Sequence, residues 1–147
     1  MAANKNKHGR SAWLLACVMG VGAANAAVYT VGPKGTPGSC THSTIQAAIN
    51  AAAGNPGTDE IRISANQIWP AQALYVENHG VDLIGGFADC ASEMPTAQTE
   101  LSGAGGVSAP VVVVSNTDSH QVRLNRLAIV DGDPAFAMAG SRDGGGI

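Results

Sequence analysis

The chain has 147 residues, of which 45% are hydrophobic and only 4% aromatic, and its formal net charge is −3. This length favours one domain rather than several. Eleven acidic residues against eight Lys and Arg argue against a surface that binds nucleic acid or an anionic membrane.

Residues 1–26 have the pattern of a secretory signal peptide. A basic beginning is followed by an apolar stretch over 11–24, and Ala24-Asn25-Ala26 forms a small-x-small cleavage site, so that Ala27 becomes the first mature residue. The basic residues are Lys5, Lys7 and Arg10. The apolar stretch is shorter than the roughly 20 residues that span a bilayer. We therefore expect an exported protein.

Two other interpretations of this segment stay open. Residues 14–17 (Leu-Leu-Ala-Cys) resemble a lipoprotein cleavage box ending at Cys17, although the apolar stretch before it is short. A buried N-terminal helix is the second alternative. Both are less consistent with the order of charge, apolar stretch and cleavage site.

Removal of 1–26 leaves one expected domain, 27–147. It takes away three cations and no acid, so the net charge moves from −3 to −6. Two cysteines remain, Cys40 and Cys90, and an even count in an oxidising compartment suggests a disulfide. Two free buried thiols are the alternative.

The mature chain begins with an alternating strand, 28–31, and a turn-rich loop over 32–38. A short helix is predicted over about 44–53, with Ser43 as N-cap and Gln46 completing a capping box. The apolar positions 45, 48, 49 and 52 form one stripe of that helix. Gly54 and Pro56 are expected to end it.

After the helix, short strand candidates alternate with turn residues. They are 60–64, 73–77, 81–84, 100–101, 110–115 and 121–130. Strands without intervening helices indicate an all-β solenoid or sandwich. Apolar residues recur at similar separations, from Ile63 to Ile84, from Leu83 to Leu101 and from Leu127 to Ile147. A period of about 20 residues favours the solenoid, and the helix would then cap its open end.

Three stretches carry a family resemblance. Residues 40–49 (CTHSTIQAAI), 59–63 (DEIRI) and 81–90 (VDLIGGFADC) resemble the start of bacterial secreted right-handed parallel β-helix proteins of the pectin-lyase-like superfamily. Residues 122–132 followed by Gly144-Gly145-Gly146-Ile147 resemble one of their rungs, and the ending is similar to a repeat of polymorphic outer membrane proteins.

The resemblance implies a parallel β-helix with a capping helix. It also implies that Cys40 pairs with Cys90, and that Gly85-Gly86 and 144–146 turn the chain between strands. The valine run 111–114 is expected to contribute to inward stacks. Because a solenoid needs several rungs and a terminal cap, we expect a fragment of a longer protein; a naturally short protein is the alternative.

No catalytic motif emerges, so no catalytic residue is predicted. Asp131 and Asp133, with Asp143, are candidates for a calcium site, since carboxylates are the ligands that calcium prefers; a simple turn is the alternative. Pectate lyases of this fold combine calcium with a basic residue, a part that Arg123 or Arg126 could imitate. No other cofactor is expected.

The remaining candidates are single residues. His42, His79 and His120 stand alone and are predicted to be surface residues rather than ligands. Trp69, Tyr75 and Phe87 are candidates for stacking on sugars, with core packing as the alternative. The glycine-rich segment 103–106 lacks the context of a dinucleotide-binding loop and is predicted to be a turn.

Three functions are compatible with these observations. The first is a secreted or cell-surface structural protein of the adhesin type, whose partners would be extracellular polysaccharide or a host or cell surface. The second is the N-terminal part of a polysaccharide lyase or hydrolase with its site elsewhere. The third is a carbohydrate-binding β-helix without catalysis. The expected location is extracellular, outer-membrane or periplasmic in a Gram-negative bacterium.

Overall fold

The computed structural model describes residues 25–36, 38–106, 108–117 and 119–133. Within these residues, short strands predominate and one helix is present. In chain order the elements are β1 (Val28–Val31), α1 (Ile45–Ala52), β2 (Thr58–Ser64), β3 (Leu74–Glu77), β4 (Gly80–Phe87), β5 (Thr99–Ser102), β6 (Val112–Ser115), β7 (Val122–Asn125) and β8 (Leu127–Val130). The all-β class predicted from the sequence is confirmed.

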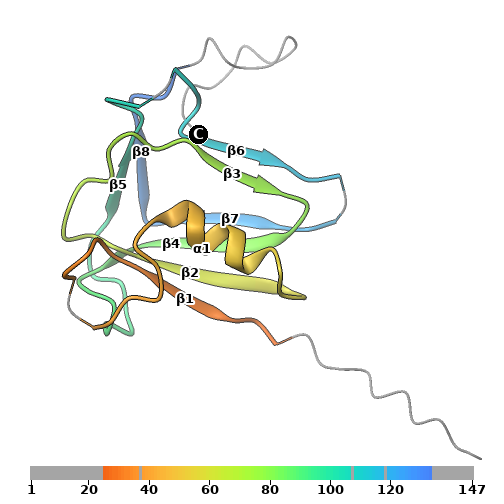
Figure 1. Ribbon diagram of the computed structural model, residues 1–147, viewed down its shortest axis with the longest axis horizontal. Helices are drawn as coiled ribbons and strands as arrows, with labels where there is room; N and C mark the ends of the chain where they lie inside the picture. Colours follow the sequence, from red (N-terminus) through yellow and green to blue (C-terminus); the bar gives the residue numbers. More distant parts are fainter. Residues whose placement is uncertain (1–24, 37, 107, 118, 134–147) are drawn as a thin grey trace, which may run out of the picture.

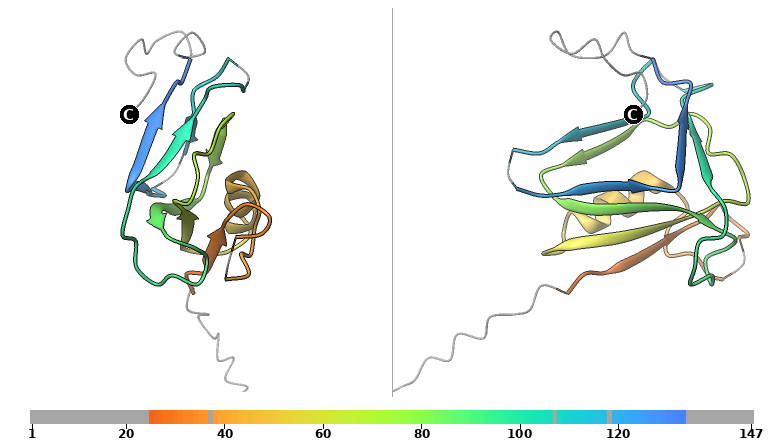
Figure 2. Two further views of the ribbon diagram at one scale, coloured as in Figure 1. Left: turned by 90° about the vertical axis from the view of Figure 1, so that its left-hand side faces the viewer. Right: turned by 180° about the vertical axis from the view of Figure 1, so that it is seen from behind.

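The strands form three parallel sheets (Figures 1 and 2). Sheet A has the order β1-β2-β4-β7, sheet B pairs β5 with β8, and sheet C pairs β3 with β6. The chain visits the sheets in a repeating order, because β4, β5 and β6 lie in A, B and C, and β7 and β8 return to A and B. Between β2 and β3, Trp69 makes an isolated parallel bridge to Leu101 of sheet B.

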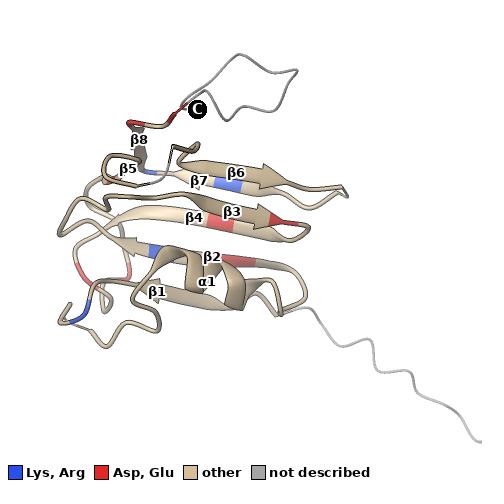
Figure 3. Ribbon diagram, turned by 45° about the horizontal axis from the view of Figure 1, so that its top comes forward, with Lys and Arg blue, Asp and Glu red and all other residues tan. Residues whose placement is uncertain are grey.

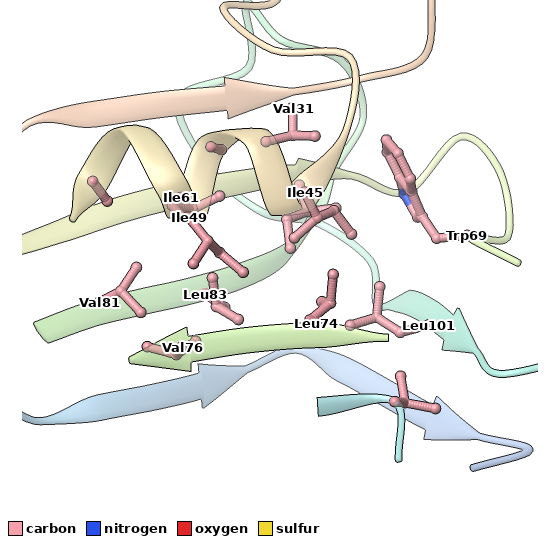
Figure 4. Packing of buried hydrophobic residues seen from close by; sticks show 14 residues of the cluster. Val31, Ile45, Ile49, Ile61, Trp69, Leu74, Val76, Val81, Leu83 and Leu101 are labelled. Atoms are coloured by element: carbon pink, nitrogen blue, oxygen red, sulfur yellow. The ribbon is translucent and has the colours of Figure 1, made fainter. Parts of the chain in front are cut away.

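The core lies between the sheets and is filled by aliphatic side chains in register (Figure 4). In sheet A, Ile61 of β2 pairs with Leu83 of β4, which pairs with Leu124 of β7. Ile61 and Leu83 are fully buried. Residues that pair in register on neighbouring parallel strands point to the same face of the sheet, so these three side chains form a row.

The predicted period of about 20 residues fits the step from β2 to β4 but not the step from β4 to β7. Leu83 pairs in register with Ile61 before it and with Leu124 after it, and the second partner lies almost twice as far along the chain as the first. Leu83 and Leu101 lie in different sheets, so their separation measures no repeat. The connections between sheets differ in length, and the spacing of apolar residues along the sequence therefore does not give the register.

Helix α1 buries the predicted stripe of Ile45, Ala48, Ile49 and Ala52. Its N-cap differs from the prediction. Thr44, in extended conformation, is the N-cap in place of Ser43 and accepts a hydrogen bond from the Ala47 amide over 3.3 Å. The helix ends at Ala52 with C-cap Ala53, before Gly54. The helix contacts β1, β2 and β3, and so covers the core where sheets A and C meet (Figure 1).

Gln46 does not complete a capping box and instead joins α1 to sheet C. Its side-chain amide donates to the Tyr75 carbonyl over 3.0 Å, and its carbonyl oxygen accepts from the Tyr75 amide over 2.9 Å. The same amide group donates to Asn50 Oδ1 over 2.8 Å. The side chain thus pairs with the free edge of β3 as a neighbouring strand would, which satisfies main-chain groups that the edge leaves unpaired.

Gln46→Glu is expected to destabilise the protein. The carboxylate can still accept from the Tyr75 amide, but it cannot donate to the Tyr75 carbonyl, and it brings two acceptors together. The expected loss is about 1–2 kcal/mol in the free energy of unfolding, measured by urea denaturation. Gln67→Glu, the same change at an exposed loop position, is the control, and an equal loss there would contradict the pairing.

Three local predictions need correction. Gly85 and Gly86 lie inside β4 rather than in a turn; Gly86 has a φ of 92°, and a Cβ there would lie 2.3 Å from the Ala97 carbonyl oxygen. The stretch 121–130 is two strands, because Arg126, with a φ of 53°, turns the chain from sheet A to sheet B. The run 111–114 is not wholly inward, since Val114 is 44% exposed.

The disulfide between Cys40 and Cys90 is confirmed. It joins the loop before α1 to the loop after β4, across 50 residues of sequence. Beside it, the Ser92 hydroxyl donates to the Asp89 carboxylate over 2.7 Å. This hydrogen bond lowers the pKa of Asp89, with further help from backbone amides.

Candidate functional site

A cleft of about 290 Å³ lies between α1 and β3 and is lined by both elements. Its lining residues are Gln46, Asn50, Ala53, Tyr75, Glu77 and His79. We call it the α1–β3 cleft. The contacts of Gln46 with Tyr75 hold its two walls together.

Tyr75 gives the cleft an aromatic surface. Strand β3 alternates between buried and exposed positions, which buries Leu74 and Val76 and exposes Tyr75 and Glu77. The Tyr75 side chain is 46% exposed, and the exposed Asn50 and Glu77 lie in the same lining. An aromatic ring beside amide and carboxylate groups can pack on the C–H face of a sugar while the polar groups bond its hydroxyls.

His79 also lines the cleft but is buried, whereas the sequence predicted a surface residue. It is 7% exposed, and its Nδ1 lies 2.8 Å from the Glu77 carbonyl oxygen. Because a carbonyl only accepts, Nδ1 carries the proton in the neutral ring and Nε2 is an acceptor. Nε2 is buried and has no hydrogen-bond partner among the described residues.

Charged residues lie on β2, β4 and β7 of sheet A (Figure 3), and they include two ion pairs. Arg62 pairs with Glu60 and lies 5.4 Å from the centre of the Phe87 ring. Arg123 pairs with Asp82 over 3.3 Å, and Asp82 and Arg123 line a second cleft of about 350 Å³. Such surface pairs add little to stability.

The two arginines considered as bases both have structural contacts. Arg123 belongs to the ion pair on sheet A. Arg126 lies at the corner between β7 and β8 and donates to the Ala97 carbonyl over 3.4 Å. In the described part of the chain, the side-chain contacts of these two arginines do not include Asp131.

The calcium candidates lie just after β8. Asp131 accepts a hydrogen bond from the Ser102 hydroxyl over 2.8 Å and has a φ of 55°. The Asp133 amide donates to the Ala109 carbonyl. Asp143 lies outside the described residues. Among the described residues, no three His, Cys, Asp or Glu side chains gather as a metal site would require, so calcium binding stays a prediction.

The other aromatic and histidine candidates divide between core and surface. Trp69 is 5% exposed and donates from Nε1 to the Ser64 carbonyl, and Phe87 is 3% exposed, so neither ring offers a face for a sugar. His42 is half-buried against Tyr29, with ring centroids 5.5 Å apart. His120 is exposed. Only Tyr75 among the three aromatic candidates lies open to solvent.

The segment 103–106 is a turn, as predicted, and the Gly106 amide donates to the Gly103 carbonyl over 3.1 Å. Among the described residues, no helix is both long and apolar enough to cross a membrane. Comparison of the chain with protein-family models, curated proteins and solved structures found no match.

Proposed function

We propose that this chain is an exported protein of the right-handed parallel β-helix type, used at the cell surface or outside the cell as a structural, adhesin-type scaffold. The observation that carries the proposal is the in-register row Ile61, Leu83 and Leu124. Such stacking, with strands returning to the same three sheets, is what a solenoid requires of its successive turns. The covered end at α1 is consistent with an N-terminal cap.

Export is supported by two independent features. The leader pattern of 1–26 predicts transfer across a membrane. The Cys40–Cys90 disulfide suits an oxidising compartment, because cytosolic thiols are kept reduced. The expected locations are the periplasm, the outer membrane and the medium of a Gram-negative bacterium. Expression with the native leader in such a host, followed by fractionation, tests this, and a soluble cytoplasmic product with its leader intact would contradict it.

An extracellular polysaccharide is the partner that the α1–β3 cleft fits best. Carbohydrate binding is favoured by one specific observation, the 46% exposed ring of Tyr75 beside Asn50 and Glu77. The lyase or hydrolase alternative would need an acidic and basic cluster that acts on the same polymer. Release of unsaturated product from a polyuronate by the exported protein would favour that alternative.

Tyr75→Ala is expected to weaken polysaccharide binding about tenfold or more, because stacking on the ring is lost. Binding to a panel of neutral and uronate polysaccharides can be measured by affinity electrophoresis. Tyr75→Phe keeps the ring and should bind as the unchanged protein does. Met94→Ala removes another exposed apolar side chain, 75% exposed, and should have no effect. Equal binding by Tyr75→Ala and Tyr75→Phe would contradict the assignment of Tyr75 as a stacking surface for polysaccharide.

A further inference from the structure

Asp59 is a fully buried carboxylate in β2, with 0% exposure. Its Oδ1 accepts from the Ala27 backbone nitrogen over 2.6 Å and from the Asn55 side-chain amide over 3.3 Å. Its Oδ2 is buried and has no hydrogen-bond partner among the described residues. A buried carboxylate is costly unless it is paired with a positive charge or fully hydrogen-bonded. In the uncleaved chain Asp59 has only neutral donors among these contacts.

The short contact to Asp59 comes from the residue that the leader pattern places first in the mature protein. In the uncleaved chain the Ala27 nitrogen is a peptide amide with a single hydrogen. Hydrolysis of the Ala26–Ala27 bond adds the hydroxyl of water to the Ala26 carbonyl carbon and its other hydrogen to the Ala27 nitrogen. The new carboxyl group then ionises, and a proton converts the Ala27 amine into an α-ammonium with three hydrogens. A positive charge then lies at the atom that already touches Asp59.

We infer that Asp59 is the receptor for the mature N-terminus, and that leader cleavage after Ala26 completes a partly buried ion pair between the Ala27 α-ammonium and the Asp59 carboxylate. This inference rests on the proposed export. The added charge compensates the whole carboxylate, including the Oδ2 that has no partner among the described residues before cleavage.

The surroundings fit this role. Ala27 is held beside β2 by a second contact, because the Glu60 amide donates to the Ala27 carbonyl over 2.9 Å. Strand β1 begins at Val28 and pairs in parallel with β2. Asn25 and Ala26, on the leader side of the bond, are exposed. The ion pair would therefore fix the first strand of sheet A at the residue that precedes it.

The test compares the mature chain from Ala27 with the chain that keeps Ala26 as one extra residue. Both are released from a fusion whose protease leaves no residue behind, and both are oxidised to form the disulfide. The extra residue is expected to lower the midpoint of thermal unfolding by about 5 °C or more. In an Asp59→Asn background the same extension should change the midpoint by less than about 2 °C.

A second measurement does not depend on the stability of Asp59→Asn. Lys34 is the only lysine after residue 26, so Lys34→Arg leaves the α-amine as the single amine of the mature chain. Its acetylation, followed by mass spectrometry, is expected to be about tenfold slower in the folded protein than in denaturant. Equal acetylation rates, or an equal cost of the extension with and without Asp59, would overturn the inference. The export experiment measures the compartment in which the protein is found. Neither of these results would contradict it, so the two proposals can fail separately.

Discussion

Replacing both cysteines, by Cys40→Ser with Cys90→Ser, is expected to lower the free energy of unfolding by about 4 kcal/mol. This is the loop-closure entropy of a bond that spans 50 residues of sequence. For a mature chain of this size the loss corresponds to a drop of about 15 °C in the midpoint of thermal unfolding. The effect is large because the bond joins two loops that only long-range packing otherwise brings together.

Calorimetry of the oxidised protein, the double variant and the reduced protein measures this effect. The reduced unchanged protein should match the double variant, since both lack the same cross-link. If the midpoints of thermal unfolding of the oxidised protein and the double variant differ by less than about 3 °C, the disulfide hardly constrains the unfolded chain, and the prediction is wrong.

Leu83→Ala is expected to cost about 3 kcal/mol in the free energy of unfolding, measured by urea denaturation. Leu83 is fully buried in β4, between its register partners on β2 and β7. Truncation removes buried methyl groups and leaves a cavity that two neighbouring strands cannot fill.

Ile84→Ala is the matched control for Leu83→Ala. Ile84 is the next residue of the same strand, faces the opposite side of sheet A and is half-exposed, so its truncation should cost less than about 1 kcal/mol. A larger loss of unfolding free energy for Ile84→Ala than for Leu83→Ala would show that the inward face of β4 has been assigned to the wrong residues.

Local periodicity predicted the individual elements well. The strand 28–31 has the bounds expected from its alternation, and the helix buries the stripe read from spacings of three and four. These signals depend only on neighbouring residues. The turn between β7 and β8 cannot be predicted locally. Arg126 forms it within a continuous strand-like stretch that has no glycine or proline.

Long-range pairing could not be predicted in the same way. Strand β4 pairs with β7 and strand β5 with β8 across connections of unequal length, so no single spacing along the sequence describes both registers. The candidate site also depends on long-range contacts, so it could not be predicted from local sequence. The alternation of β3 places Tyr75 opposite the buried Leu74 and Val76, but no local signal shows that Gln46 meets Tyr75 across 29 residues. The contact between Ala27 and Asp59 likewise exists only in the folded chain.

We propose that this chain is exported, cleaved after Ala26 and cross-linked once, between Cys40 and Cys90. Intact-mass measurement of the product, expressed with its native leader and isolated without reductant from outside the cytoplasm, tests it most directly. The predicted mass is that of a chain beginning at Ala27 with Cys40 and Cys90 oxidised to one disulfide. A retained leader, a lipid on Cys17 or two free thiols would contradict the claim.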